Sequence, residues 1–332
     1  MKATARANTN IALIKYWGKR DEKLFLPMNS SLSITLDRFY STTTVEFSDN
    51  FSEDKFILND IQGSAEDCMK ISNFLTKIRN IAGTNLYASV ITANNVPTAA
   101  GFASSASGYA ALAAAATRAL GLELSNEELS MIARQGSGSA CRSIYGGYVE
   151  WEMGMRADGR DSLAKQVLDE TKWKLSILSA VVARGQKKVS SREGMKRTVE
   201  TSPYYKGWLK TVAYDLEEAK IAIEQRDFER LGEVMERNAL KMHATMLSAK
   251  PPILYWESGT VEIMNCITQL RQEGISAYFT IDAGANVKVL CLPECEEEVR
   301  NALLELTGVQ QVITCYPGQG VSYLTEGSTR RT

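Results

Sequence analysis

The chain has almost no histidine: among its 332 residues, His243 is the only one. Histidine is the side chain whose charge changes near neutral pH, and its scarcity argues against a histidine-based catalytic triad and a histidine-rich metal site. His243 follows Met242 in a segment with a helical pattern, and we expect it to pack or cap rather than to catalyse. Acid–base and binding chemistry must then rest on Asp, Lys, Arg and Ser.

Cysteine is also scarce, and its spacing fits no common zinc-binding pattern. The six cysteines are Cys68, Cys141, Cys266, Cys291, Cys295 and Cys315. Cys291 and Cys295 flank Pro293, which is more typical of the end of a strand than of a metal-binding knuckle. We expect reduced thiols and a cytoplasmic protein.

An excess of one charge and long apolar runs are missing as well. The formal net charge is -1, which excludes a general affinity for nucleic acid or for anionic membranes. No stretch approaches the roughly 18 apolar residues that a membrane span needs, and Met1 to Arg6 lead into no signal-peptide core. An anionic ligand must therefore be bound by a local cluster of Lys and Arg.

What remains is the composition of an ordinary globular protein, with 44% hydrophobic and 23% charged residues. The length predicts two domains or one large one. Strand-like and helical patterns are mixed without strict alternation, which predicts an α+β fold. The predicted strands are 42–47, 86–92, 175–182, 277–281 and 287–292. The predicted helices are 71–82 before Gly83, 105–120, a short helix after the capping box Ser125–Glu128, 204–225, 228–240, 261–273 and 296–306.

The most distinctive segment is the run of small residues from Pro97 to Gly108, which leads into an alanine-rich helix. A helix N-terminus offers unpaired backbone N–H groups and a partial positive charge, and small side chains let a polyphosphate approach that backbone. Ser104, Ser105 and Ser107 add hydroxyl donors. The segment favours phosphate binding, with a tightly packed helix against a sheet as the alternative.

Two further segments combine a cation with hydroxyl groups. Residues 10–19 run from an apolar strand core to Tyr16 and Lys19, and lysine is a point charge suited to phosphate. Residues 137–142 place hydroxyls and accessible backbone N–H groups beside Arg142, which suits a diphosphate or a carboxylate. The alternatives are a first strand with surface lysines and a Gly/Ser loop with a structural arginine.

Two more candidates lie further along the chain. Residues 187–192 form a basic cluster with hydroxyls, for which a solvated linker is the alternative. Asp282 lies between two predicted strands, and its small neighbours allow a substrate to approach closely. Asp near Gly284 also forms ordinary turns, so the turn interpretation stays open on the residues alone.

Together these segments closely resemble the mevalonate diphosphate decarboxylases, a family of the GHMP kinase superfamily of small-molecule kinases. The segments that carry the resemblance are 10–19, 27–33, 96–107, 136–147, 189–195 and 282–288, in the family's order. The resemblance implies a two-domain α+β GHMP kinase-like fold with the active site in the interdomain cleft. The implied parts are an N-terminal ATP-binding domain over 1–185, a ferredoxin-like C-terminal domain over 186–325 and a polar tail over 326–332.

The resemblance also implies a reaction: ATP-dependent conversion of mevalonate 5-diphosphate into isopentenyl diphosphate, with ADP, phosphate and CO2, in isoprenoid biosynthesis. The 3-hydroxyl would be phosphorylated, and loss of phosphate would then drive decarboxylation. ATP and Mg2+, a small-molecule substrate, no nucleic acid or membrane partner, and a cytoplasmic homodimer are implied with it. The cations that would offset the negative charge of both ligands are Arg6, Lys15, Lys19, Arg142, Lys187, Lys188 and Arg192.

Residue by residue, the resemblance implies a catalytic set of Asp282, Lys187, Arg142 and Ser191, with Asp282 as the general base or orienting group at the 3-hydroxyl. The implied substrate contacts are Asn10, Tyr16, Trp17, Gly18, Lys19, Ser137, Gly138, Ser139, Ala140, Cys141, Arg142, Ser191 and Arg192. The implied nucleotide contacts are Lys70, Pro97, Ala100, Gly101, Ala103, Ser104, Ser105 and Ser107, with Ser105 also near the magnesium.

The chain departs from the family pattern at Ala285, where relatives often have proline, and at Asn8, where they often have histidine. The main alternative is a kinase of the same superfamily that acts on mevalonate or a phosphomevalonate without decarboxylation, against which Asp282, Arg142 and Lys19 argue. A decarboxylase for the monophosphate would need fewer diphosphate contacts. A nucleotide-binding regulator without catalysis would not need Asp282.

Overall fold

The structure, a computed structural model, describes residues 1–95, 104–182 and 188–325. Its strands are β1 (Lys2–Ile14), β2 (Lys19–Asp21), β3 (Leu26–Pro27), β4 (Ser31–Ser48), β5 (Lys55–Leu58), β6 (Ile61–Gln62), β7 (Tyr87–Asn94), β8 (Tyr148–Trp151), β9 (Ala164–Leu168), β10 (Ser176–Val181), β11 (Ala277–Ile281), β12 (Val287–Cys291), β13 (Gln311–Cys315) and β14 (Ser322–Leu324). Its α-helices are α1 (Ala65–Ala82), α2 (Ser104–Ala119), α3 (Asn126–Arg134), α4 (Ser191–Thr201), α5 (Tyr205–Gln225), α6 (Phe228–Leu247), α7 (Ser258–Gln272) and α8 (Glu296–Leu304). Two 3₁₀ helices are η1 (Gly138–Ile144) and η2 (Pro293–Cys295).

The larger sheet is built mainly from the N-terminal half of the chain. It has eight strands, in the order β14-β1-β4-β7-β5-β6, with β8 paired to β4 and β9 to β8. Helix α2 packs into the same core as β1 and β4, and its residues Ala110 to Ala116 are buried. Alanine side chains are short, so the helix axis can lie close to the sheet. The predicted strands 42–47 and 86–92 are confirmed inside β4 and β7.

Two helices of this half confirm signals that are local in the sequence. Helix α1 ends at Gly83, whose φ of 66° lies in the left-handed region and whose N–H bonds to the carbonyl oxygen of Arg79. Helix α3 begins at a capping box, in which Ser125 Oγ accepts the N–H of Glu128 and Glu128 accepts the N–H of Ser125. Both boundaries follow from residues within a few positions of them.

The smaller sheet has four antiparallel strands in the order β11-β12-β10-β13. Its central strand β10 is buried at every position, which confirms the predicted buried strand. Leu178 faces a core with helices α7 and α8, and Ile177 faces a core with helices α5 and α6. Because both faces of β10 are covered, its sequence is an almost continuous apolar run, interrupted only by Ser176 and Ser179, rather than an alternating one. The larger sheet is antiparallel except for the parallel β5–β7 pair, the smaller sheet is fully antiparallel, and separate helices cover them, which confirms the α+β prediction.

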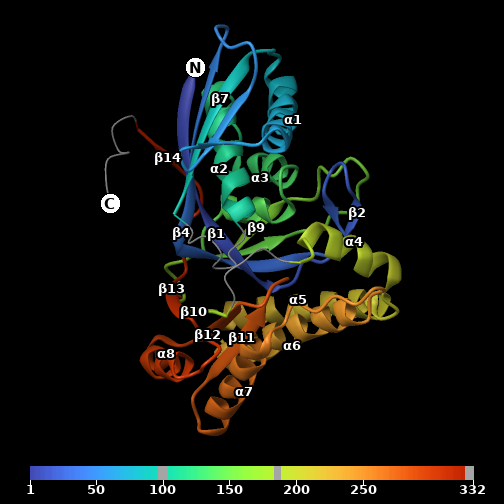
Figure 1. The fold of residues 1–332 in the computed structure, drawn as a ribbon, viewed down its shortest axis with the longest axis vertical. Helices are drawn as coiled ribbons and strands as arrows, with labels where there is room; N and C mark the ends of the chain where they lie inside the picture. The colour runs from blue at the N-terminus through green and yellow to red at the C-terminus, as the bar shows by residue number, and fades with distance from the viewer. Residues whose placement is uncertain (96–103, 183–187, 326–332) are drawn as a thin grey trace.

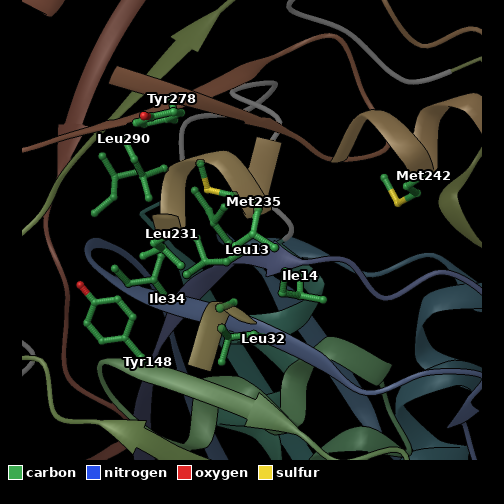
Figure 2. Close-up of a cluster of buried hydrophobic side chains, with 14 of the residues drawn as sticks. Leu13, Ile14, Leu32, Ile34, Tyr148, Leu231, Met235, Met242, Tyr278 and Leu290 are labelled. Atoms are coloured by element: carbon green, nitrogen blue, oxygen red, sulfur yellow. The ribbon is translucent and has the colours of Figure 1, made fainter. Parts of the chain in front are cut away.

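The two lobes are continuous through one shared core. In Figure 1 the blue-to-green N-terminal lobe and the orange-to-red C-terminal lobe follow each other along the longest axis. Figure 2 shows Leu13 and Ile34 of the larger sheet against Met235 of α6, with Tyr278 and Leu290 of the smaller sheet beyond it. No helix among the described residues combines the length and the apolar character needed to cross a bilayer.

Strand pairing also bears on the position of the boundary between the two lobes along the chain. β10 belongs to the smaller sheet although it precedes residue 186, and β14 returns to the larger sheet beside β1. The predicted boundary between 185 and 186 rested on a polar, basic segment, and it stays a prediction. In the pairing itself, the smaller sheet already begins at Ser176.

Candidate functional site

A cavity of about 790 Å³ lies where the two lobes meet. Its walls come from the end of β1, from α1, from the first turn of α2, from η1 and α4, and from the loop after β11. Many of the predicted site residues line it. They are Asn10, Tyr16, Trp17, Lys19, Lys70, Ser105, Ser137, Gly138, Ser139, Arg142, Ser191, Arg192 and Asp282.

Four predicted site residues do not line the cavity: Gly18, Ser107, Ala140 and Cys141. Gly18 has a φ of 103°, and a Cβ there would overlap the hydroxyl of Tyr205, so glycine is required for packing. Ser107 is buried and its hydroxyl lies 2.7 Å from that of Ser41. Burial raises the pKa of Cys141 to about 12, so the thiol stays protonated at neutral pH.

Five predicted residues fall outside the part of the chain that the structure describes. These are Pro97, Ala100, Gly101, Ala103 and Lys187. Their assignments as nucleotide contacts and, for Lys187, as a catalytic residue stay predictions. Ser104 is the first residue of α2.

Asp282 directly follows β11 and meets Lys15 just after the end of β1. Lys15 Nζ donates to Asp282 Oδ1 at 2.7 Å and to the carbonyl oxygen of Ala12 at 2.9 Å. The Lys15 side chain is 1% exposed and that of Asp282 is 36% exposed. Burial lowers the pKa of Lys15, and the Asp282 carboxylate partly offsets this effect. The buried ammonium thus fixes a carboxylate that stays open to the cavity.

The main chain of Lys15 is held on both sides by buried amide side chains. Its N–H donates to Asn238 Oδ1 at 2.9 Å, and its carbonyl oxygen accepts from Asn29 Nδ2 at 2.8 Å. Asn238 Nδ2 in turn donates to Asp215 Oδ2 at 2.8 Å, and Asp215 pairs with Lys241 at 2.6 Å. The sequence predicted only positive charge for Lys15, because Asn238 and Asp282 lie 223 and 267 positions away along the chain.

Arg142 lies in η1 and is only 2% exposed. Its guanidinium donates to Ser31 Oγ at 2.6 Å and to Asn10 Oδ1 at 3.3 Å, while its Nε has no hydrogen-bond partner among the described residues. Burial lowers the pKa of Arg142. No carboxylate among residues 1–95, 104–182 and 188–325 forms an ion pair with it. A buried cation with an unused donor fits an anionic ligand that supplies the missing acceptor.

Tyr16 presents a second unused donor at the cavity. Its hydroxyl is buried without a hydrogen-bond partner among the described residues, and burial raises its pKa. Gly138 leaves room for this ring, because a Cβ there would lie 3.1 Å from the Tyr16 hydroxyl. Ser137 Oγ lies 3.4 Å from Ser105 Oγ and so links the loop before η1 to the start of α2.

We call Asn10, Lys15 and Arg142 the buried wall of the cavity, and Glu66, Lys70 and Ser105 its exposed wall. Lys70 pairs with Glu66 at 2.7 Å, and their side chains are 48% and 72% exposed. Ser105 is exposed in the first turn of α2, which contains no acidic residue. A helix start with a serine, no acidic residue in its own first turn and a lysine on the neighbouring helix fits the phosphates of a nucleotide.

The described residues contain no cluster of three His, Cys, Asp or Glu side chains that would hold a metal ion. This arrangement fits a magnesium ion that is held largely through phosphate oxygens, with Ser105 as a hydroxyl neighbour. His243, predicted to pack, is confirmed as buried; its Nε2 lies 3.3 Å from the carbonyl oxygen of Ile281, and its ring centroid lies 5.0 Å from that of Trp256 with the planes tilted by 37°.

Two family models match this chain, and together they span most of it. Residues 7–164 match the diphosphomevalonate decarboxylase-like N-terminal domain, and residues 177–326 match the mevalonate 5-diphosphate decarboxylase C-terminal domain. Human diphosphomevalonate decarboxylase is 41% identical over 317 residues, which cover 89% of this chain and 78% of the human protein.

Solved structures are similar over the full length. The mevalonate diphosphate decarboxylase from Enterococcus faecalis, solved in work on ATP binding mediated by mevalonate diphosphate, is 48% identical with a TM-score of 0.91, and the match covers 98% of this chain and 99% of that one. MDDEF in complex with MVAPP, AMPPCP and magnesium is 48% identical with a TM-score of 0.92, with coverage of 98% and 99%. The arrangement of both lobes around the cavity is therefore shared with these proteins.

Proposed function

The chain belongs to the diphosphomevalonate decarboxylase family, with the family's GHMP kinase-like fold, and we propose how its cavity carries out the reaction. It is an ATP-dependent decarboxylase that converts mevalonate 5-diphosphate into isopentenyl diphosphate, ADP, phosphate and CO2. One observation carries the residue assignments. Asp282, held by Lys15, and Arg142, with its unused Nε donor, line the same cavity.

Bound with magnesium, ATP supplies the phosphoryl group that turns the substrate's 3-hydroxyl into a leaving group. We assign the binding of its phosphates to Lys70 and Ser105 on the exposed wall, with Ser104 and Ser107 of the same helix start, and, outside the described residues, to Pro97, Ala100, Gly101 and Ala103. Lys187 is proposed to act beside Asp282 on the transferring group. The first turn of α2 supports this assignment, since the unpaired N–H groups at a helix start favour bound phosphate.

Asp282 is proposed to accept the proton of the 3-hydroxyl as that oxygen attacks the phosphoryl group. The Lys15 ammonium keeps this carboxylate ionised and oriented through the 2.7 Å contact. In the next step the C3–O bond breaks and its electron pair leaves with phosphate. The electron pair of the adjacent C–C bond then forms the C=C double bond, and the carboxyl group departs as CO2.

Arg142 is proposed to hold the substrate carboxylate, with Asn10 and Ser191 as neighbours. Its unused Nε supplies a donor, and its burial excludes water from the reacting carboxylate. A carboxylate held by a fixed guanidinium keeps the breaking C–C bond aligned with the departing phosphate. This feature favours decarboxylation over simple phosphoryl transfer, which needs no carboxylate site.

The diphosphate of the substrate is proposed to bind at the mouth of the buried wall. The proposed contacts are Tyr16, Trp17, Lys19, Ser137, Gly138, Ser139 and Arg192, which all line the cavity. Gly18, Ala140 and Cys141 support this site through packing and backbone position. The unused Tyr16 hydroxyl and the two cations provide donors that suit phosphate oxygens.

We further propose a cytoplasmic homodimer with an N-terminal domain over 1–185 and a C-terminal domain over 186–325. The free cysteines among the described residues support a reducing compartment. The family resemblance supports the dimer and the two domains. Light scattering coupled to size-exclusion chromatography tests the dimer, since a mass near that of one 36.6 kDa chain would contradict it.

The reaction is tested by one coupled assay with ATP and mevalonate 5-diphosphate. We expect ADP and CO2 to appear in equal amounts, because each phosphoryl transfer commits one molecule to decarboxylation. ADP without CO2 would identify a kinase and overturn the decarboxylase assignment. Mevalonate 5-phosphate serves as the control substrate and is expected to react far more slowly.

A further inference from the structure

Phe25 has an unusual backbone conformation in the turn between β2 and β3. Its φ is 55°, in the left-handed region that bulky side chains rarely adopt. The residue nevertheless lines the cavity and is half-buried there. An unfavourable conformation at a ligand site is a reason to look for a role of the side chain.

The Phe25 ring is surrounded by cations from separate elements. Lys19 Nζ of β2 lies 4.5 Å from the ring centroid, Lys77 Nζ of α1 lies 5.9 Å away, and Arg192 Cζ of α4 lies 5.7 Å away. Cations are attracted to an aromatic face, so one ring can hold several of them near each other. The positive charges repel one another, which an anion between them would relieve.

Lys77 is the member of this group that the proposed function does not use, whereas Lys19 and Arg192 are proposed diphosphate contacts. Lys19 pairs with Glu22 at 2.6 Å, whereas no carboxylate in the described ranges forms an ion pair with Lys77. Its Nζ donates to the carbonyl oxygen of Gln135 at 3.3 Å. Burial, with a smaller contribution from Arg134, lowers the pKa of Lys77. A half-buried ammonium that lines the cavity therefore has donors left for a ligand.

Lys77 lies seven residues after Lys70, which is about two helical turns along the same face of α1. The two lysines nevertheless point to different parts of the cavity. Lys70 pairs with Glu66 on the exposed wall, whereas Lys77 shares the Phe25 ring with Lys19 and Arg192. The position of Lys77 thus matches the proposed diphosphate end of the cavity rather than the proposed nucleotide end.

We propose that Lys77, positioned by Phe25, is a further binding residue for the outer phosphate of the substrate's diphosphate. This proposal rests on the proposed placement of the diphosphate near Lys19 and Arg192. The outer phosphate brings the additional negative charge that distinguishes a diphosphate from a monophosphate. Lys77 would therefore contribute to that selectivity without taking part in the chemical steps.

The test compares Lys77→Met with wild type. We expect the KM for mevalonate 5-diphosphate to rise about tenfold, because one charge-assisted hydrogen bond is lost. The kcat and the KM for ATP should stay within twofold. An unchanged KM for the diphosphate, or a rise in the KM for ATP instead, would overturn the proposal. Lys55→Met, which removes an exposed lysine of β5, is the control for charge alone and should change neither constant.

Phe25 is tested by a pair of variants. Phe25→Leu keeps an apolar side chain but removes the aromatic face, and we expect the KM for the diphosphate to rise severalfold. Phe25→Tyr keeps that face, and its KM for the diphosphate should stay close to that of wild type. If Leu and Tyr at this position behave alike, the ring does not position Lys77.

A binding measurement separates this inference from the proposed function. Titration calorimetry with inorganic pyrophosphate should give a Kd about tenfold weaker for Lys77→Met than for wild type. This readout needs no turnover, so it stands even if the assay for ADP and CO2 contradicts decarboxylation. Equal pyrophosphate affinity in both proteins would remove Lys77 from the site whatever reaction the enzyme performs.

Discussion

The buried wall and the exposed wall of the cavity hold their charges in opposite ways. Lys15 is 1% exposed in its side chain and Arg142 is 2% exposed, and protein donors and acceptors fix both. Lys70 is 48% exposed in its side chain and pairs with Glu66, a residue on its own helix that is more exposed still. One wall is organised by tertiary packing, and the other by a single turn of helix.

This difference predicts how each wall responds to change. On the buried wall a lost group cannot be replaced by water, so effects on the reaction are large and depend little on salt. On the exposed wall water and ions screen each charge, so effects are small and depend on salt. Arg142 and Lys70 are both proposed to bind an anionic ligand, yet we expect their contributions to differ by more than tenfold.

The largest effect is expected for Asp282→Asn. The amide cannot accept the proton of the 3-hydroxyl, so kcat should fall by about 10² to 10⁴-fold. ATP binding, followed by titration calorimetry, should be nearly unchanged because the exposed wall is intact. Turnover close to that of wild type would mean that Asp282 neither accepts the proton nor orients the substrate.

A smaller loss is expected for Lys15→Met. The methionine fills the buried space but leaves Asp282 without its 2.7 Å contact, and kcat should fall about 10- to 100-fold. The free energy of unfolding, measured by urea titration, should change little, since the uncharged side chain no longer needs solvation. A large loss of stability with an unchanged kcat in the folded fraction would show that Lys15 acts only in folding.

The pH dependence of stability offers a further test of the buried wall, because His243 lies behind the Asp282 loop. Burial lowers its pKa to about 4, from 6.5 when unfolded, so the unfolded state binds more protons between these values. Stability is therefore lost as the pH falls. Between pH 7 and pH 5, this group should lower the free energy of unfolding by about 2 kcal/mol.

His243→Phe keeps a ring against Trp256 and cannot titrate. Urea titrations at both pH values should show a smaller decrease for this variant than for wild type. If both proteins lose the same unfolding free energy, other groups cause the acid sensitivity and His243 does not contribute to it.

The smallest effect is expected for Lys70→Met on the exposed wall. The KM for ATP should rise two- to fivefold at low ionic strength, a change typical of one solvent-exposed charge. At about 0.5 M salt, where the Debye length is only a few ångströms, the difference should largely disappear. A salt-independent effect of tenfold or more would place Lys70 among residues fixed by tertiary structure, and the contrast between the walls would fail.

Much of the fold was predictable because its signals are local. Gly83 ends α1 by its own backbone conformation, and Ser125 with Glu128 begins α3 through contacts three residues apart. The run of alanines in α2 predicts a tightly packed helix, and Ala110 to Ala116 are buried. The short strands β8 and β9 were missed, since they are defined by the neighbours they pair with rather than by a pattern of their own.

Many of the predicted site residues come together at one cavity, whereas the connections between them were not predictable. The resemblance identified Asp282 and Arg142, and the structure brings both to one cavity. The pairing of Lys15 with Asp282 and the clamp by Asn238 depend on how β1, α6 and β11 come together. No spacing in the sequence encodes such contacts, and Lys77 was missed because one lysine on an amphipathic helix looks like any other.

The pairing of β14 with β1 has a consequence for biosynthesis. Thr4 lies opposite Leu324, and Asn8 Nδ2 donates to the carbonyl oxygen of Gln319 at 3.0 Å. The outer edge of the first strand therefore stays open until the ribosome has reached residues 322–324, a delay of tens of seconds at usual elongation rates. During that interval an unpaired strand edge can associate with other nascent chains. A chaperone that shields the N-terminal lobe during synthesis should raise the yield of folded enzyme more than one added after release.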